Sequence, residues 1–102
     1  MAETPEMLHL CSRVREYLSR QDFKTSSEEI SYAMYLYPHA PEPHNLMGIL
    51  MEKSHDHMTA MRHFRAAQVL DPTYRPAMQN MMDYARLDQH HPRCRFTTAD
   101  CD

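Results

Sequence analysis

Identical residues recur 34 positions apart in this 102-residue chain, and such a period restricts the fold more than any local preference does. The comparison covers each residue of the segment 22–38 and the residue 34 positions later. Five pairs are identical: Asp22 and Asp56, Thr25 and Thr59, Ala33 and Ala67, Leu36 and Leu70, Pro38 and Pro72. Average composition gives roughly one identity over these seventeen positions. The spacing therefore predicts an internal repeat with this period.

The second copy of this repeat carries small, aromatic and proline residues at fixed spacing. They are Gly48, Ala60, Phe64, Ala67 and Pro72. Their order and spacing resemble the tetratricopeptide-repeat (TPR) pattern, W-x2-L-G-x2-Y followed by A-x3-F, a small residue and a proline, without any gap. The family's Trp, Leu and Tyr positions hold His44, Met47 and Met51, which are still medium or large side chains. The segment 41–74 therefore resembles a divergent TPR repeat.

The segment 7–40 follows the same register more loosely. Leu10, Tyr17, Ile30, Ala33 and Pro38 occupy signature positions, whereas Arg13, Val14 and Ser26 depart from the pattern. Because the family's glycine lets two helices approach closely, Val14 in its place predicts a splayed or shifted first pair. From Arg75 onward only one further helix fits. It resembles the capping helix that closes a TPR array, with Met78, Met81, Met82 and Ala85 expected to face inward.

The resemblance implies an all-α fold, a right-handed superhelix of antiparallel helix pairs (TPR-like). A single glycine in the chain also disfavours a sheet, which needs glycine at several hairpin turns. We expect five helices near residues 5–20, 25–37, 42–54, 57–70 and 75–87, the second beginning with a capping box of Thr25 and Glu28. One domain, 1–87, then contains the repeats 7–40 and 41–74 and the capping helix 75–87. Residues 88–102 are expected to form a polar, flexible tail.

Charge and composition exclude several classes of function. The net charge of −3 provides no basic field for nucleic acid. No apolar stretch approaches the roughly 20 residues of a membrane span, and the first ten residues lack a basic region followed by an apolar one, which predicts a cytoplasmic protein. Three cysteines, an odd number, fit a reducing compartment, although Cys94 and Cys101 could pair with each other.

The resemblance also implies a concave groove lined by the first helix of each pair. The family's ligand-contacting positions hold Cys11, Arg15, Ser19, Asn45, Ile49, Glu52, Lys53, Gln79, Asn80, Asp83 and Arg86. Side-chain amides in such a groove hold the backbone of an extended peptide, and Arg15, Lys53 and Arg86 can meet an acidic group. Because Cys11 and Arg15 replace the Lys and Asn of the chaperone-binding carboxylate clamp, that clamp is not expected. The alternative is a polar face that is merely solvated.

Other kinds of chemistry have weaker signals. His90, His91, Cys94 and Cys101 could hold a metal, but Pro92 interrupts them and they lack the close-spaced pairs of a zinc site. No nucleophile motif or phosphate-binding glycine loop is present, so neither an enzyme nor a cofactor is expected. The leading hypothesis is a protein-interaction module whose groove binds a peptide or helix of a partner. A self-associating structural protein and a metal-binding protein are the alternatives.

Overall fold

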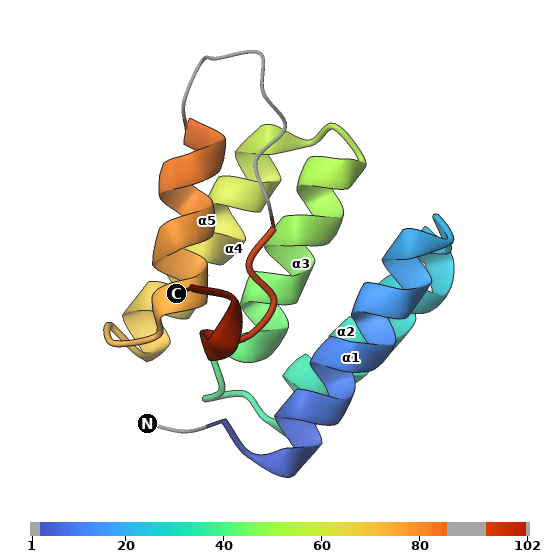
Figure 1. The fold of residues 1–102 in the computed structure, drawn as a ribbon, viewed down its shortest axis with the longest axis horizontal. Helices are drawn as coiled ribbons and strands as arrows, with labels where there is room; N and C mark the ends of the chain where they lie inside the picture. Colours follow the sequence, from blue (N-terminus) through green and yellow to red (C-terminus); the bar gives the residue numbers. More distant parts are fainter. Residues whose placement is uncertain (1–2, 86–93, 102) are drawn as a thin grey trace.

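Every secondary-structure element in the computed structural model, which describes residues 3–85 and 94–101, is a helix. The five α-helices are α1 (Pro5–Ser19), α2 (Phe23–Leu36), α3 (Glu42–Lys53), α4 (His57–Leu70) and α5 (Arg75–Ala85), followed by a 3-10 turn, η1 (Thr98–Cys101) (Figure 1). The expected all-α fold of five helices is therefore confirmed. Within the described ranges, each helix is too short or too polar to cross a bilayer.

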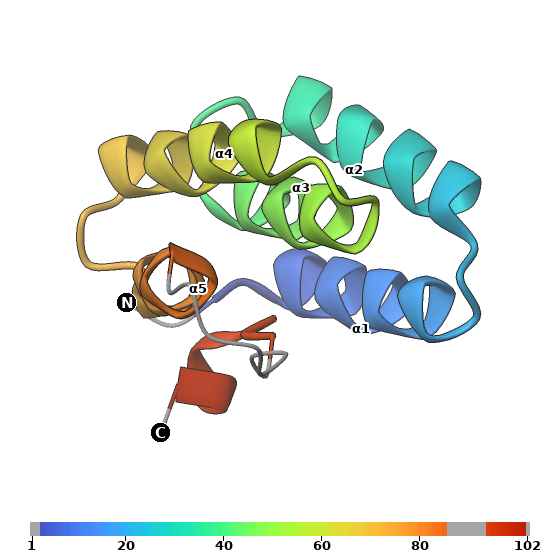
Figure 2. The ribbon, with the colours of Figure 1, turned by 90° about the horizontal axis from the view of Figure 1, so that it is seen from above.

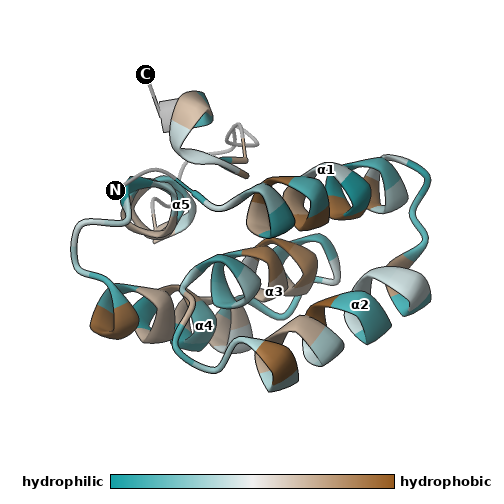
Figure 3. Ribbon diagram, turned by 90° about the horizontal axis from the view of Figure 1, so that it is seen from below, coloured by the Kyte–Doolittle hydropathy of each residue, from teal (hydrophilic) through white to brown (hydrophobic). Residues whose placement is uncertain are grey.

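The central element is α3, because it packs against each of the other four helices. Seen from above, α2 and α4 lie on one side of the molecule, and α1 and α5 lie on the other (Figure 2). All residues from Asn45 to Leu50 are buried, so this stretch of α3 has no solvent-facing side, as expected for a helix enclosed by others. Hydrophobic stretches of α1 and α3 face each other, whereas the turns are mostly hydrophilic (Figure 3).

The turns inside the two helix pairs have the same geometry, one repeat period apart. Gln21 and His55 have positive φ angles of 60° and 65°, the left-handed conformation that commonly ends a helix. The backbone N–H of the next residue, Asp22 or Asp56, donates back to the preceding helix over 2.8 Å in both turns. The period found in the sequence is thus also a period of the backbone.

The same aspartates begin the second helix of each pair. The side chain of Asp22 accepts a hydrogen bond from the backbone N–H of Thr25, and Asp56 accepts one from Thr59, each over 3.2 Å. The predicted capping box of Thr25 and Glu28 is therefore wrong, because α2 begins at Phe23 with Asp22 as its cap. This bond explains the identity of Asp22 and Asp56, since an aspartate oxygen satisfies an amide that the helix leaves unpaired.

The two repeats have residues of different volume at equivalent positions of their helix pairs. A Cβ atom on Gly48 would lie 2.6 Å from Cδ1 of Phe64, which is fully buried. At the same positions of the first repeat the chain has Val14 and Ile30, both fully buried in the core. The helices of the first pair nevertheless pack less closely than α3 and α4 do, and a hollow lies between α1 and α2, as expected for a pair with Val14 in place of glycine.

The inward face of α5 differs from the predicted one. Its buried residues are Pro76, Ala77 and Asn80, whereas Met78 and Met82 are 41% and 52% exposed. Met81 is half-buried and packs against the core, as expected. The prediction from methionine spacing was wrong for two reasons. Methionine is also tolerated on surfaces, and the buried side of α5 includes a polar residue, Asn80.

We predict that Gly48→Val and Phe64→Ile are coupled. Gly48→Val alone should lower the free energy of unfolding by about 3 kcal/mol or more, because the side chain collides with the ring of Phe64. The double variant recreates the pair found in the first repeat, and its loss should be smaller than the sum of the single losses by about 1–2 kcal/mol. Urea unfolding of the four proteins measures this coupling.

A matched control combines Gly48→Val with Val69→Ala, a substitution at an 81% exposed position of the same helix as Phe64. These two changes should be additive, because Val69 lies outside the contact. Additivity of the Gly48 and Phe64 substitutions would show that the two positions do not compensate each other.

Candidate functional site

The C-terminal segment, residues 94–101, lies against α1, α3 and α5 and ends in η1 (Figures 1 and 2). We call the surface that it covers the inner face, formed by Arg15 of α1, Asn45 of α3, and Asn80 and Asp83 of α5. A flexible tail was expected from residue 88. The structure differs for residues 94–101, which are held by the contacts described below, and residues 88–93 lie outside the described residues.

Two buried asparagines bind the backbone of Arg95. Its carbonyl oxygen accepts hydrogen bonds from Nδ2 of Asn45 over 2.8 Å and from Nδ2 of Asn80 over 2.7 Å. Its N–H donates to Oδ1 of Asn80 over 2.7 Å, and Nδ2 of Asn80 also donates to Oδ1 of Asn45 over 2.8 Å. Both asparagines are fully buried. The arrangement satisfies buried amides that would otherwise carry a large desolvation cost.

Arg15 of α1 contacts the segment at two points. Its Nη2 lies 2.5 Å from Oδ2 of Asp100, and its guanidinium carbon lies 4.6 Å above the ring centre of Phe96. The side chain of Asp100 is 15% exposed and that of Arg15 is 53% exposed. Solvent therefore screens the ion pair mainly at Arg15. Phe96 is buried in the main hydrophobic core. Arg15 thus binds an aromatic side chain and a carboxylate together.

Asp100 and Glu3 shape the bound segment. Oδ2 of Asp100 accepts from the backbone N–H groups of Phe96 and Thr97, over 3.0 and 3.2 Å, which folds the segment into a compact turn. Oε1 of Glu3 accepts from both the N–H and the hydroxyl of Thr98, over 2.9 and 3.0 Å. The chain just before α1 and the segment after α5 therefore meet at one end of the inner face.

The other end of the segment contacts α5. Nε of Arg95 lies 4.0 Å from Oδ2 of Asp83, and the sulfur of Cys94 lies 2.7 Å from the hydroxyl of Tyr84. Burial, followed by the bond to Cys94, raises the pKa of Tyr84 well above its usual range, so this hydroxyl stays protonated. The Tyr84 hydroxyl therefore meets the segment as a neutral group.

The other residues predicted for a groove that lie within 3–85 are buried in the core, bond to groups outside the segment, or are exposed. Ile49 is fully buried in the same cluster as Phe96. Cys11 is also buried in that cluster, and burial raises the pKa of its thiol to about 12. Glu52 pairs with His57 over 2.7 Å, Gln79 donates to Asp83 over 3.0 Å, Ser19 donates to the carbonyl of Glu16, and Lys53 is exposed. Arg86 lies outside the described residues.

The residues of this site that were not singled out from the sequence include Glu3, Tyr84, Arg95, Phe96 and Asp100. All of these except Tyr84 lie outside the repeats and the capping helix, where the period gives no information. Phe96 was the available signal, because one aromatic residue in an otherwise polar stretch has little reason to remain in water.

The predicted metal candidates are not assembled in the described part of the chain. Residues 3–85 and 94–100 contain no group of three His, Cys, Asp or Glu side chains placed to hold an ion. Cys94 is a free thiol bonded to Tyr84. His90 and His91 lie outside the described residues, as does the side chain of Cys101.

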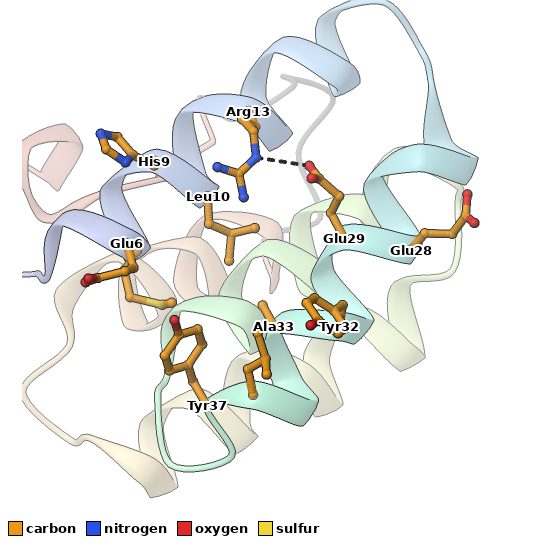
Figure 4. A pocket seen from close by; sticks show the side chains of 11 residues that line it. Glu6, His9, Leu10, Arg13, Glu28, Glu29, Tyr32, Ala33 and Tyr37 are labelled. Atoms are coloured by element: carbon orange, nitrogen blue, oxygen red, sulfur yellow. Dashed lines mark hydrogen bonds and ion pairs between the residues drawn. The ribbon is translucent and has the colours of Figure 1, made fainter.

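A separate hollow of about 480 Å³ opens between α1 and α2 (Figure 4). Leu10, Ala33 and Tyr37 lie along it, and an ion pair of Arg13 and Glu29 over 3.2 Å joins the two helices beside it. The side chains of Tyr32, Leu36 and Tyr37 are 63%, 46% and 40% exposed. This α1–α2 hollow is the exposed apolar end of the helix stack.

A half-buried histidine pair lies between α3 and α4. The Nδ1 atoms of His44 and His63 are 3.2 Å apart, and their rings stack with centres 5.4 Å apart. Desolvation lowers the pKa of both side chains, and the neighbouring His44 lowers that of His63 further. One neutral ring donates to the other, an arrangement that two protonated rings cannot form.

Comparison of the chain with models of known protein families, with curated proteins and with solved structures found no match. The function is therefore inferred from the contacts of the chain itself.

We predict that Asn80→Ala lowers the free energy of unfolding by about 2 kcal/mol. The substitution removes a partner from both backbone groups of Arg95 and leaves Oδ1 of Asn45 without its donor. The neighbouring Gln79→Ala, which removes one bond to Asp83, should change the free energy by about 0.5 kcal/mol or less. Urea unfolding compares the two variants, and equal losses would contradict the role given to Asn80.

We also predict that acid destabilises the histidine pair. The unfolded-state pKa is near 6.5 and the folded-state pKa is lower, so the unfolded chain binds more protons between these two values. The free energy of unfolding should therefore fall as the pH is lowered through 6.5 and level off, for this pair, below the folded pKa. In His63→Gln the slope of stability against pH should be smaller. An unchanged slope would show that the pair does not titrate in this way.

Proposed function

We propose that the protein is a peptide-binding module of the TPR type, whose inner face takes an extended segment of a protein partner. The observation that carries the proposal is the pairing of Asn45 and Asn80 with both backbone polar groups of Arg95. Every residue except proline offers the same N–H and C=O groups, so these amides can hold the backbone of any segment in this conformation. Binding of this kind requires no chemistry by the module itself.

The repeat supports membership of the TPR family. Its period recurs in the helix ends, with α2 and α4 beginning at Phe23 and His57 and ending at Leu36 and Leu70. The repeats are 7–40 and 41–74, and α5 covers the open side of the second, as a capping helix does. A cytoplasmic location is part of the proposal, supported by the free thiols of Cys11 and Cys94.

The polar chemistry of the inner face defines what the partner supplies. Asn45 and Asn80 take its backbone, whereas Arg15 combines a positive charge with a flat surface that stacks on an aromatic ring. Arg15 therefore provides the selectivity, and it favours a segment with an acidic or aromatic side chain.

The α1–α2 hollow is a second candidate surface, because exposed Tyr32, Leu36 and Tyr37 border it. Stacking of a second copy on this end would bury these side chains, which keeps self-association as the alternative function. The two surfaces are separate and can be tested in one experiment.

Selection of random peptides on the immobilised full-length chain tests the proposal. Selected peptides should lose affinity by about tenfold or more on Arg15→Glu, because they lose a charge-assisted contact and gain a repulsive one. Fluorescence anisotropy measures this loss. Arg65→Glu, the same change at an exposed position of α4, is the control and should leave affinity unchanged.

Two outcomes would contradict the proposal. Equal losses on the Arg15 and Arg65 variants would mean that net charge alone governs binding. Loss of affinity on Tyr32→Lys with none on Arg15→Glu would assign binding to the α1–α2 hollow instead, and light scattering would then test for a dimer.

A further inference from the structure

The C-terminal segment has the contacts of a bound peptide. Its backbone is held by side chains of α3 and α5, its aromatic ring lies under a cation of α1, and its carboxylate pairs with that same cation. In contrast to the packing of α1 to α5, the segment places one large hydrophobic side chain, Phe96, in the core. These are interactions that another chain of similar sequence can reproduce.

The geometry therefore specifies the ligand. Arg95 supplies the backbone groups, Phe96 follows directly, and Asp100 stands four residues after Phe96. Arg15 contacts both Phe96 and Asp100, because its guanidinium lies 4.6 Å above the ring of Phe96 and 2.5 Å from Oδ2 of Asp100. The carboxylate also holds the N–H groups of Phe96 and Thr97, so the aromatic ring and the acid belong to one compact turn.

We propose that residues 94–101 are an internal ligand of the inner face, which a partner segment carrying an aromatic residue and an acidic residue four positions later displaces. The inference rests on the proposed peptide-binding function and adds the ligand's chemistry and its regulation. A partner must outcompete a segment in the same chain, whose effective concentration is on the order of millimolar for a short connection. The internal ligand thus sets the affinity threshold for partners.

The core of the second repeat is connected to the segment through Tyr84. Phe64, enclosed against Gly48, stacks on Tyr84 with ring centres 6.2 Å apart, and the hydroxyl of Tyr84 contacts Cys94. Displacement removes the partner of this hydroxyl and exposes the thiol of Cys94. Thiol reactivity therefore reports the state of the segment.

The first test measures binding of a fluorescein-labelled hexapeptide, Arg-Phe-Thr-Thr-Ala-Asp, to the full-length chain by anisotropy. A full-length variant with Phe96→Ala and Asp100→Ala weakens the internal ligand and should bind the peptide about tenfold or more tighter than the wild type does. Adding Arg15→Glu to this variant should abolish the gain, whereas adding Arg65→Glu should preserve it. A peptide with Ala in place of Phe and Asp should not bind.

The second test follows the thiol of Cys94 in a Cys101→Ser background, where Cys11 is buried. Modification by a disulfide reagent should become faster on adding the hexapeptide, in proportion to the bound fraction. This readout keeps the inference testable if the Phe96 and Asp100 substitutions perturb folding. If the peptide binds but the modification rate of Cys94 does not change, the inference is overturned, because the internal segment would then remain in place.

The outcomes separate the two proposals. If selected peptides bind through Arg15 but the hexapeptide binds no tighter to the weakened variant than to the wild type, the internal-ligand inference falls and the peptide-binding function stands. If no peptide responds to Arg15→Glu in either protein, the proposed function itself falls. If the hexapeptide binds the weakened variant through Arg15 and binds it more tightly than the wild type, both proposals are supported.

Discussion

The contact of Gly48 with Phe64 is the constraint on which the rest of the structure depends. It brings α4 against α3 so closely that a Cβ at this position would overlap the ring. Because α3 packs on all four other helices, its position relative to α4 also determines where α1, α2 and α5 can lie. The first repeat has Val14 and Ile30 at the same two positions, both fully buried, and its two helices pack less closely.

This packing has a polar consequence on the inner face. Enclosing α3 buries Asn45, and covering α4 with α5 buries Asn80 close beside it. Two fully buried amides need partners, and an apolar surface cannot provide them. The backbone of Arg95 satisfies them in this structure. The inner face therefore requires backbone groups or water as partners, and this requirement connects the stability of the fold with the binding proposed above.

The sequence was informative where the period applied. Asp22 and Asp56, identical and one period apart, are the helix caps, although the capping box inferred from Thr25 and Glu28 assigned that role to the wrong residue. The resemblance to the TPR pattern also implied that Asn45, Asn80 and Arg15 share one surface, and the structure brings them together around Arg95, Phe96 and Asp100. The resemblance could not predict Phe96 and Asp100, whose contacts depend on chain folding beyond the repeats. The buried face of α5 was predicted wrongly from its methionines, because hydrophobic spacing cannot reveal that the buried face contains an asparagine.

If the inner face binds a partner as proposed, stability and recognition draw on the same interactions there. The free energy that Arg95, Phe96 and Asp100 contribute to the folded chain is also the amount that a competing segment must exceed. Backbone contacts to the two asparagines are equal for nearly all segments, so they cannot distinguish one partner from another. The proposed function therefore assigns discrimination to Arg15, which is half exposed and binds ring and carboxylate together. In that proposal, Arg15 at the rim selects the segment by its side chains, whereas the buried pair Asn45 and Asn80 holds its backbone.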